Sequence, residues 1–322
     1  AISAQDGVLV TTRAGSVFRV EDGGVSRICD LTVPLWRSVA EDDYSRLWIG
    51  TYGFGLYRHD SERLRVYSEE SGVSRAQVRA VDAEGEVSLA MSGGLVQRDS
   101  EKRFAAVPSW IEIGHENPDI TALARDTLGR LWIGKRNGYV YVQEGQSYER
   151  CVTDERLAGY AIDSMEVDSD GRVWVASSVG AGLACYEGPQ VLRYIDPSEL
   201  PFSPPRVSAI ATGPDGEVYV GSAHPNVWDG IAELDGESFR RASGLSGVAV
   251  NALCVGPGGR LWVGSNEGLA VLEEDYILSF GMSDCLSSEL ITSLSCDKEG
   301  RIWIGTEGGG LCLHDGDVFQ VI

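Results

Sequence analysis

The chain has 322 residues, of which 43% are hydrophobic and 40 are glycine, and its formal net charge is −21. This apolar content is enough for a folded core and excludes intrinsic disorder. The excess of 48 acidic over 27 basic residues disfavours binding to nucleic-acid phosphates or to anionic lipid. The sequence has no run of 18 apolar residues, so we expect no membrane insertion.

One short motif recurs along the whole chain. It has the form Gly-Arg-Leu-Trp-Ile-Gly and is clearest around Trp132, Trp262 and Trp303. Taken in chain order, the position of the aromatic residue falls at Val10, Trp48, Ser88, Trp132, Trp174, Tyr219, Trp262 and Trp303. The intervals are 38 to 45 residues, and self-similarity at this period indicates a repeat architecture.

Each repeat unit predicts four short strands. In the last unit these are residues 291–296, the Trp303 strand, residues 310–314 and residues 318–322, separated by turns rich in Asp and Gly. Four antiparallel strands per unit form a β-meander. The Trp strand is apolar at adjacent positions, which is typical of a strand covered on both faces.

Strand-rich repeats of this length that close radially make a β-propeller. We therefore predict an all-β fold, a β-propeller of eight four-stranded antiparallel blades, with seven blades as the alternative if the eroded first unit packs differently. The chain is predicted to be one propeller domain over residues 1–322. Its expected units are roughly 1–34, 35–75, 76–117, 118–159, 160–204, 205–247, 248–288 and 289–322.

The seven cysteines show no metal-binding spacing. Most lie inside apolar stretches, for example Cys254 and Cys312, and we interpret them as small buried hydrophobic residues. Seven apparently unpaired thiols favour a reducing compartment such as the cytoplasm, or secretion in an anaerobic setting.

The stretch from Asp297 to Leu311, Asp-x-x-Gly-Arg-Ile-Trp-Ile-Gly-Thr-x-x-Gly-Gly-Leu, resembles the two-component regulator propeller repeat. The lead-in at residues 246–253 resembles the same repeat, and the resemblance extends over essentially the whole chain. It implies an extracytoplasmic sensor propeller of the kind found in hybrid histidine kinases, often recognising oligosaccharides. It also implies a periplasmic or extracellular location. Streptogramin lyases use similar Trp-Gly repeats.

Candidate binding residues lie where the chain departs from the repeat, in loops between second and third strands and between units. The longest such loop, residues 222–230, brings together His224, Asn226, Trp228 and Asp229, either as a ligand site or as a self-packed loop. Trp110 and Phe202 in two long connections are expected on the same face, as an aromatic rim or as caps on the sheets.

Shorter loops of that face contribute Tyr52 and the run Lys135, Arg136 and Asn137. The two cations are notable in so acidic a chain; they are candidates to receive an anionic group, or they form a solvated loop pair. Asn266 and Glu307 occupy corresponding loops.

The sequence contains no catalytic motif, so we predict a protein that is not an enzyme and has no cofactor or metal. His59 and His314 occupy the same place in two units, which repeat structure explains. A calcium site at 168–171 is disfavoured because these residues form the ordinary turn between strands and lack further ligands.

The predicted function is recognition of a small polar ligand, such as a glycan, by a monomer. A protein–protein scaffold is the first alternative. A lyase-like enzyme that uses a metal with His115 or His224 is the second.

Overall fold

The computed structural model describes the backbone of the chain except at residues 1, 5–6, 12–15, 22–23, 31–35, 43, 45, 52–54, 61–62, 69–70, 74–77, 83–86, 92–93, 99–102, 108–118, 152–154, 178–180, 202–205, 223–229, 237, 242–247, 273–276, 283–285, 287, 297–299, 308, 315, 317 and 322. Side chains are described from residue 40 onward, again with gaps. The chain groups into two compact units, residues 2–151 and 152–322.

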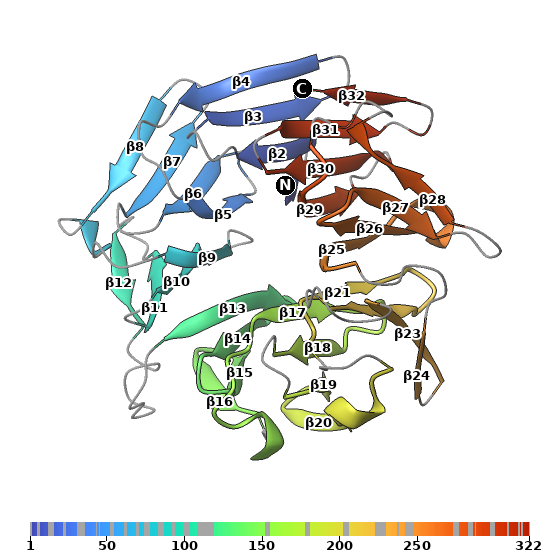
Figure 1. Ribbon diagram of the computed structural model, residues 1–322. Helices are drawn as coiled ribbons and strands as arrows, with labels where there is room; N and C mark the ends of the chain where they lie inside the picture. The colour runs from blue at the N-terminus through green and yellow to red at the C-terminus, as the bar shows by residue number, and fades with distance from the viewer. Residues whose placement is uncertain are drawn as a thin grey trace. The chain divides into compact units, whose positions relative to one another are not determined.

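The first unit consists of four-stranded antiparallel meanders (Figure 1). Their strands are β1 (Ile2–Ala4), β2 (Gly7–Thr11), β3 (Ser16–Glu21) and β4 (Gly24–Asp30); β5 (Trp36–Glu41), β6 (Leu47–Thr51), β7 (Leu56–Asp60) and β8 (Arg63–Tyr67); β9 (Val78–Asp82), β10 (Ser88–Met91), β11 (Gly94–Arg98) and β12 (Phe104–Ala106); β13 (Ile120–Arg125), β14 (Leu131–Lys135), β15 (Val140–Glu144) and β16 (Ser147–Arg150).

The second unit repeats this plan. Its strands are β17 (Ser164–Val167), β18 (Val173–Ala176), β19 (Leu183–Glu187) and β20 (Gln190–Ile195); β21 (Ala209–Thr212), β22 (Val218–Gly221), β23 (Ile231–Asp235) and β24 (Ser238–Arg241); β25 (Val250–Val255), β26 (Leu261–Ser265), β27 (Leu269–Leu272) and β28 (Ile277–Phe280); β29 (Ile291–Cys296), β30 (Ile302–Thr306), β31 (Gly310–His314) and β32 (Phe319–Val321). The short 3-10 turns are η2 (Glu155–Leu157), η3 (Pro197–Glu199) and η4 (Pro257–Gly259).

The prediction of an all-β chain built from four-stranded antiparallel meanders is confirmed. Seven of these sheets, from β5 to β32, have described side chains, and backbone pairing alone defines the sheet β1–β4. Each sheet lies within one of the units expected from the repeat. No helix among the described residues is long and apolar enough to cross a membrane.

The strand register confirms the alignment of the repeats. Trp36 pairs with Thr51, Ile120 with Lys135 and Ile291 with Thr306, so the three residues at the start of a first strand are equivalent. In each case the register shifts after the first pair, which marks a bulge at the same place. Trp36 therefore occupies the first position of the first strand in its sheet.

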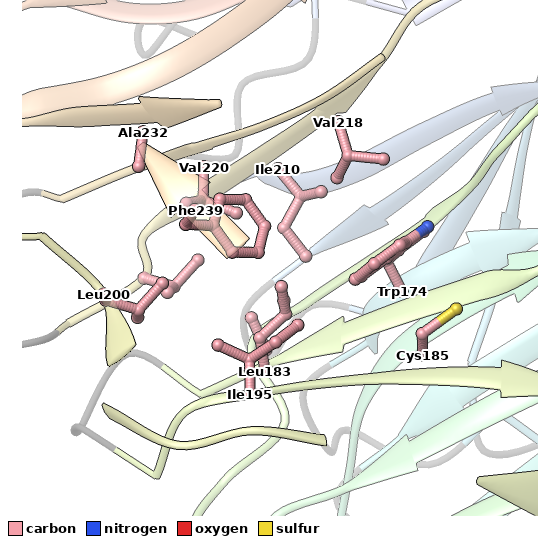
Figure 2. Close-up of a cluster of buried hydrophobic side chains, with 12 residues drawn as sticks. Trp174, Leu183, Cys185, Ile195, Leu200, Ile210, Val218, Val220, Ala232 and Phe239 are labelled. Carbon is pink, nitrogen blue, oxygen red and sulfur yellow. The ribbon is translucent and has the colours of Figure 1, made fainter. Parts of the chain in front are cut away.

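The core lies between neighbouring sheets. In the second unit, Trp174 and Leu183 of sheet β17–β20 form one cluster with Ile210, Val220 and residues around them in sheet β21–β24 (Figure 2). Both faces of the aromatic strand are buried, which explains its continuous apolar pattern.

The glycine two residues after the aromatic residue, within the same strand, permits the close approach of a side chain from the next sheet. A Cβ added to Gly221 would lie 2.5 Å from Cγ1 of Val250 in the next sheet. A Cβ on Gly264 would lie 2.5 Å from Cγ2 of Ile291 in the same way. Each glycine thus receives the first apolar residue of the following sheet.

Candidate functional site

The turn between first and second strands holds a buried carboxylate that the sequence analysis did not single out. Oδ1 of Asp126 accepts hydrogen bonds from the backbone N–H groups of Leu128 and Arg130, at 3.0 and 2.9 Å. Its Oδ2 accepts from Nε of Arg130 and from the indole Nε1 of Trp132, both at 2.8 Å. Burial raises the pKa of Asp126, but the bonds from Trp132 and Arg130 outweigh burial, and the pKa ends below its ordinary value.

The same network recurs at two other turns. Asp168 accepts from Arg172 Nε at 2.8 Å and from Trp174 Nε1 at 2.9 Å. Asp42 accepts from the corresponding Arg46 and Trp48. The repeated Asp, Arg and Trp are therefore structural, and the carboxylate of Asp168 is already engaged where a calcium site had been weighed. Because these side chains bond to one another, we do not include them in the candidate binding site.

At the opposite end of the sheets, backbone hydrogen bonds hold the loops that follow the second strands. The N–H of Arg136 donates to the carbonyl of Asp119 at 3.0 Å, that of Asn266 to Ala249 at 3.2 Å and that of Glu307 to Leu290 at 2.8 Å. Each bond ties the loop after a second strand to the residue at or just before the first strand of the same sheet. Within each of these sheets the loop and the incoming connection share one end, as the sequence analysis expected.

Arg136 is the best-described member of the predicted site. Its side chain is 50% exposed, and its Nε lies 2.9 Å from Oδ2 of Asp119. Arg79, from the first strand β9 of the preceding sheet, reaches the same oxygen at 3.4 Å. Two guanidinium groups thus share one carboxylate.

Asn137 shapes the loop. It is half-buried, and its side-chain oxygen accepts from the N–H of Tyr139 at 3.4 Å, ahead of Gly138 with a φ of 85°. This is the usual role of Asn in a turn.

Lys135 was predicted to be a cation of the loop, but it lies in a strand. It is the last residue of β14 and is fully buried, with Nζ 5.7 Å from the centre of the Tyr141 ring. Burial lowers its pKa to about 8. The counterparts of Lys135 in other sheets include Thr51 and Ser265, whose hydroxyls donate to loop carbonyls at 2.7 and 2.8 Å. The prediction that Lys135 belongs to a solvated loop pair is wrong, because the strand continues one residue further and draws the side chain inward.

The remaining predicted site residues lie outside the described residues. They are Tyr52, Trp110, His224, Asn226, Trp228 and Asp229. Phe202 and the two histidines of the enzyme alternative, His115 and His224, also lie there.

The other two histidines are structural, as repeat position predicted. His59 pairs with Leu47 and His314 with Ile302, which are equivalent positions. The His314 ring lies 4.9 Å from that of Trp262 and 4.6 Å from that of Phe319. Among the described residues, no three His, Cys, Asp or Glu side chains converge as metal ligands would.

Sequence reasoning missed a cavity of about 610 Å³ in the second unit, lined by sheets β17–β20 and β21–β24. The cavity is open to solvent and its lining is mixed: Trp174, Cys185, Leu192 and Leu234 contribute apolar surface, and Arg172, Arg193 and Glu199 contribute charged groups. Arg193 donates to the carbonyl of Gly236 at 3.2 Å, and Glu199 accepts from the N–H of Asp196 at 2.8 Å.

Burial raises the pKa of Cys185 to about 12, so its thiol is neutral at physiological pH. The small Cys185 beside Trp174 is the one signal in the sequence that could have indicated this space.

Comparison with known proteins supports the repeat assignment. Residues 285–308 match the family model described as "Two component regulator propeller". These residues are similar to one repeat of that family. This confirms the resemblance seen at Asp297 to Leu311. A comparison with curated proteins finds no match.

Solved structures with β-propeller folds resemble the whole chain. A streptogramin B lyase is 12% identical with a TM-score of 0.65, covering 87% of this chain and 94% of its own. BamB from Moraxella catarrhalis is 17% identical with a TM-score of 0.66, covering 99% and 95%. The extracellular domain of a protein described as a one component system of B. thetaiotaomicron is 18% identical with a TM-score of 0.61. That match covers 87% of this chain and 38% of the other. At these identities the likeness shows the fold alone.

Proposed function

We propose that this chain is a non-catalytic, sensor-type binding propeller that recognises a small polar ligand, such as an oligosaccharide, on the face formed by the loops between second and third strands. In this proposal the sheets are the blades of a β-propeller. A count of seven blades fits the seven sheets from β5 to β32 whose side chains are described, in place of the eight predicted from the repeat. The proposed location is periplasmic or extracellular, in line with the extracellular relative of similar fold, and the proposed state is a monomer.

One observation carries the proposal. Arg136, Asn266 and Glu307 occupy the same position, four residues after the repeat Trp, and the same backbone hydrogen bond holds each loop. All three side chains are exposed, yet they differ in chemistry: a cation, an amide and an anion. Tyr52 stands at this position after Trp48. A rigid backbone that presents different polar groups at equivalent points is what a specific binding face needs.

The other end of the sheets behaves in the opposite way. There the Asp, Arg and Trp side chains recur and bond to one another. At the loop end the side chains differ from sheet to sheet, although Arg136 is paired with Asp119 and Oδ1 of Asn266 accepts from the N–H of Ala249 at 3.0 Å. This contrast favours the loop end as the site of recognition.

The test is thermal unfolding of the full chain against a panel of soluble oligosaccharides, with and without magnesium or calcium. A ligand that binds only the folded form adds about 2.7 kcal/mol of stability at a hundredfold excess over its dissociation constant. We expect an upward shift that Arg136→Ala and Trp228→Ala each reduce. Arg240→Ala is the control, because Arg240 is an exposed arginine of strand β24, paired with Asp235.

Each outcome separates the alternatives. A shift that persists in both site variants keeps the ligand and discards the loop end. The absence of a shift with any glycan transfers support to the protein–protein scaffold. A change in a streptogramin substrate that depends on added metal would support the lyase alternative, which rests on likeness of fold, and fold by itself does not determine activity.

A further inference from the structure

Two thiols from neighbouring sheets of the second unit lie against each other. Cys254 belongs to β25 and Cys296 to β29, the first strands of adjacent sheets. Both are reduced and half-buried, and they are packed against the same cluster, which contains Trp262 and Ile302. Their side chains are in hydrogen-bond contact. A disulfide requires this kind of side-chain proximity between two cysteines that are distant in sequence.

The strand register shows that this position is where neighbouring sheets are tied together. Cys254 pairs with Trp262 and Cys296 with Ile302. The residues at the same two register positions in the first unit are Asp82, which pairs with Ser88, and Arg125, which pairs with Leu131. Asp82 and Arg125 form an ion pair between their sheets. The Cys254–Cys296 contact therefore stands where the other unit has an ionic cross-link.

We propose that Cys254 and Cys296 are a modification site at which oxidation forms a disulfide that joins sheet β25–β28 to sheet β29–β32. The oxidant is a small-molecule or protein disulfide. One thiolate attacks a sulfur of that donor and displaces a thiol, giving a mixed disulfide. The second thiolate then attacks the sulfur of the first cysteine and displaces the other donor thiol. The protein loses two electrons and two protons, and the donor disulfide is reduced to two thiols.

The environment sets the rate of this reaction. The hydrogen bond to Cys296, followed by burial, raises the pKa of Cys254, so the neutral thiol is favoured at physiological pH. Thiolates are the attacking species in disulfide exchange, so uncatalysed oxidation is expected to be slow near neutrality and faster as pH rises. Once formed, the bond closes the long loop between residues 254 and 296 and stabilises the fold by restricting the unfolded chain.

The experiment incubates the full chain with oxidised glutathione at pH 8.5, followed by acid quench and titration of thiols in denaturant. The reduced chain has seven thiols. We expect the oxidised chain to have two fewer and its unfolding midpoint to rise by several degrees, with the rise reversed by dithiothreitol. Cys254→Ser and Cys296→Ser should each prevent both changes, and Cys185→Ser, which removes a buried thiol of another sheet, should prevent neither.

Peptide mapping of the wild-type chain decides the connectivity without any variant. Trypsin together with a glutamate-specific protease releases residues 242–260 with Cys254 and residues 290–298 with Cys296, and separates the latter from Cys285. A cross-linked pair of these two peptides, lighter than their sum by two hydrogen atoms, is the expected product. Retention of all seven thiols after prolonged oxidation, or a bond that maps to other cysteines, would overturn the proposal.

Discussion

The indole Nε1 of Trp132 donates a 2.8 Å hydrogen bond to Oδ2 of Asp126, six residues earlier in the chain. The bond satisfies the polar atom of a fully buried aromatic residue, and the same oxygen also accepts from Arg130. One turn thereby joins the core of the sheet to its surface. The repeated spacing of Asp, Arg and Trp follows from this geometry.

Asp168→Asn should destabilise the fold by about 3 kcal/mol, because an amide that replaces a buried carboxylate cannot accept every bond from Arg172 and Trp174. Asp170→Asn is a matched control two residues away. Its side chain is 66% exposed and that of Asp168 is 0% exposed, so its loss should cost less than about 0.5 kcal/mol. Urea denaturation measures both, and equal effects would contradict the structural role of Asp168.

The lowered pKa of Asp126 predicts a pH dependence. The folded-state pKa lies below the unfolded value of about 3.9, so the unfolded chain binds more protons between the two values. The stability that this carboxylate contributes is present above the unfolded pKa and is lost as pH falls through the folded pKa. The difference in stability between wild type and Asp126→Asn should therefore shrink on acidification. Urea denaturation at a series of pH values below about 6 tests this, and a constant difference would count against it.

Lys135→Met should stabilise the protein at pH 7 by about 1–3 kcal/mol, because it removes the cost of burying a charge while keeping the side-chain volume. The pKa of Lys135 is about 8 when folded, below its ordinary unfolded value. The folded chain then binds fewer protons in this interval, and wild-type stability should rise with pH above about 8 until the unfolded lysine titrates near 10.4. The Met variant should lack this rise. Lys135→Arg keeps the charge and should show no stabilisation.

Gly256→Ala should destabilise the sheet β25–β28 by about 1–3 kcal/mol through overpacking. Gly256 stands where other turns have the buried Asp, and an added Cβ would lie 2.8 Å from Nε1 of Trp262 and 3.0 Å from Cδ1 of Ile302. Gly281→Ala is the control, because a Cβ there meets no atom within 4 Å. Thermal unfolding of both variants tests the prediction. Similar unfolding midpoints would show that the Trp262 side chain can shift away from the added Cβ without loss of stability.

Asp82 and Arg125 should be coupled across their two sheets. Nε of Arg125 donates to Oδ1 of Asp82 at 3.3 Å, its Nη2 pairs with Oδ2, and both side chains are mostly buried. A double-mutant cycle with Asp82→Ala and Arg125→Ala should give a coupling energy of about 1–2 kcal/mol. The exposed pair Arg240 and Asp235 should give less than about 1 kcal/mol in the same cycle. Additive effects at Asp82 and Arg125 would contradict a stabilising link.

Local pattern was enough to predict the sheets. The period of the Trp motif, the apolar strands around Trp132 and Trp174 and the Asp-Gly turns each depend on neighbours within a few residues. These local features are therefore sufficient to predict four antiparallel strands per unit. The equivalent register positions of Trp36, Ile120 and Ile291 follow the same repetition.

The candidate site was less predictable. Arg136 was found from its loop position, but its partner Asp119 is shared with Arg79, which belongs to another sheet. Lys135 was misplaced, because one residue decides whether a side chain at a strand end points inward or to solvent. The cavity beside Trp174 was missed, since an unfilled space between sheets depends on several distant side chains at once.

By itself, the sequence determined the repeat, the strand order within each unit and the loops in which the units differ in sequence. These features depend on contacts between residues that are near neighbours in the chain. Only the tertiary structure decided that Asp126 is engaged by its own turn, that Lys135 is buried and that Cys254 meets Cys296. The physical reason is that such contacts join residues from different strands or sheets, and their geometry depends on packing that no local pattern records.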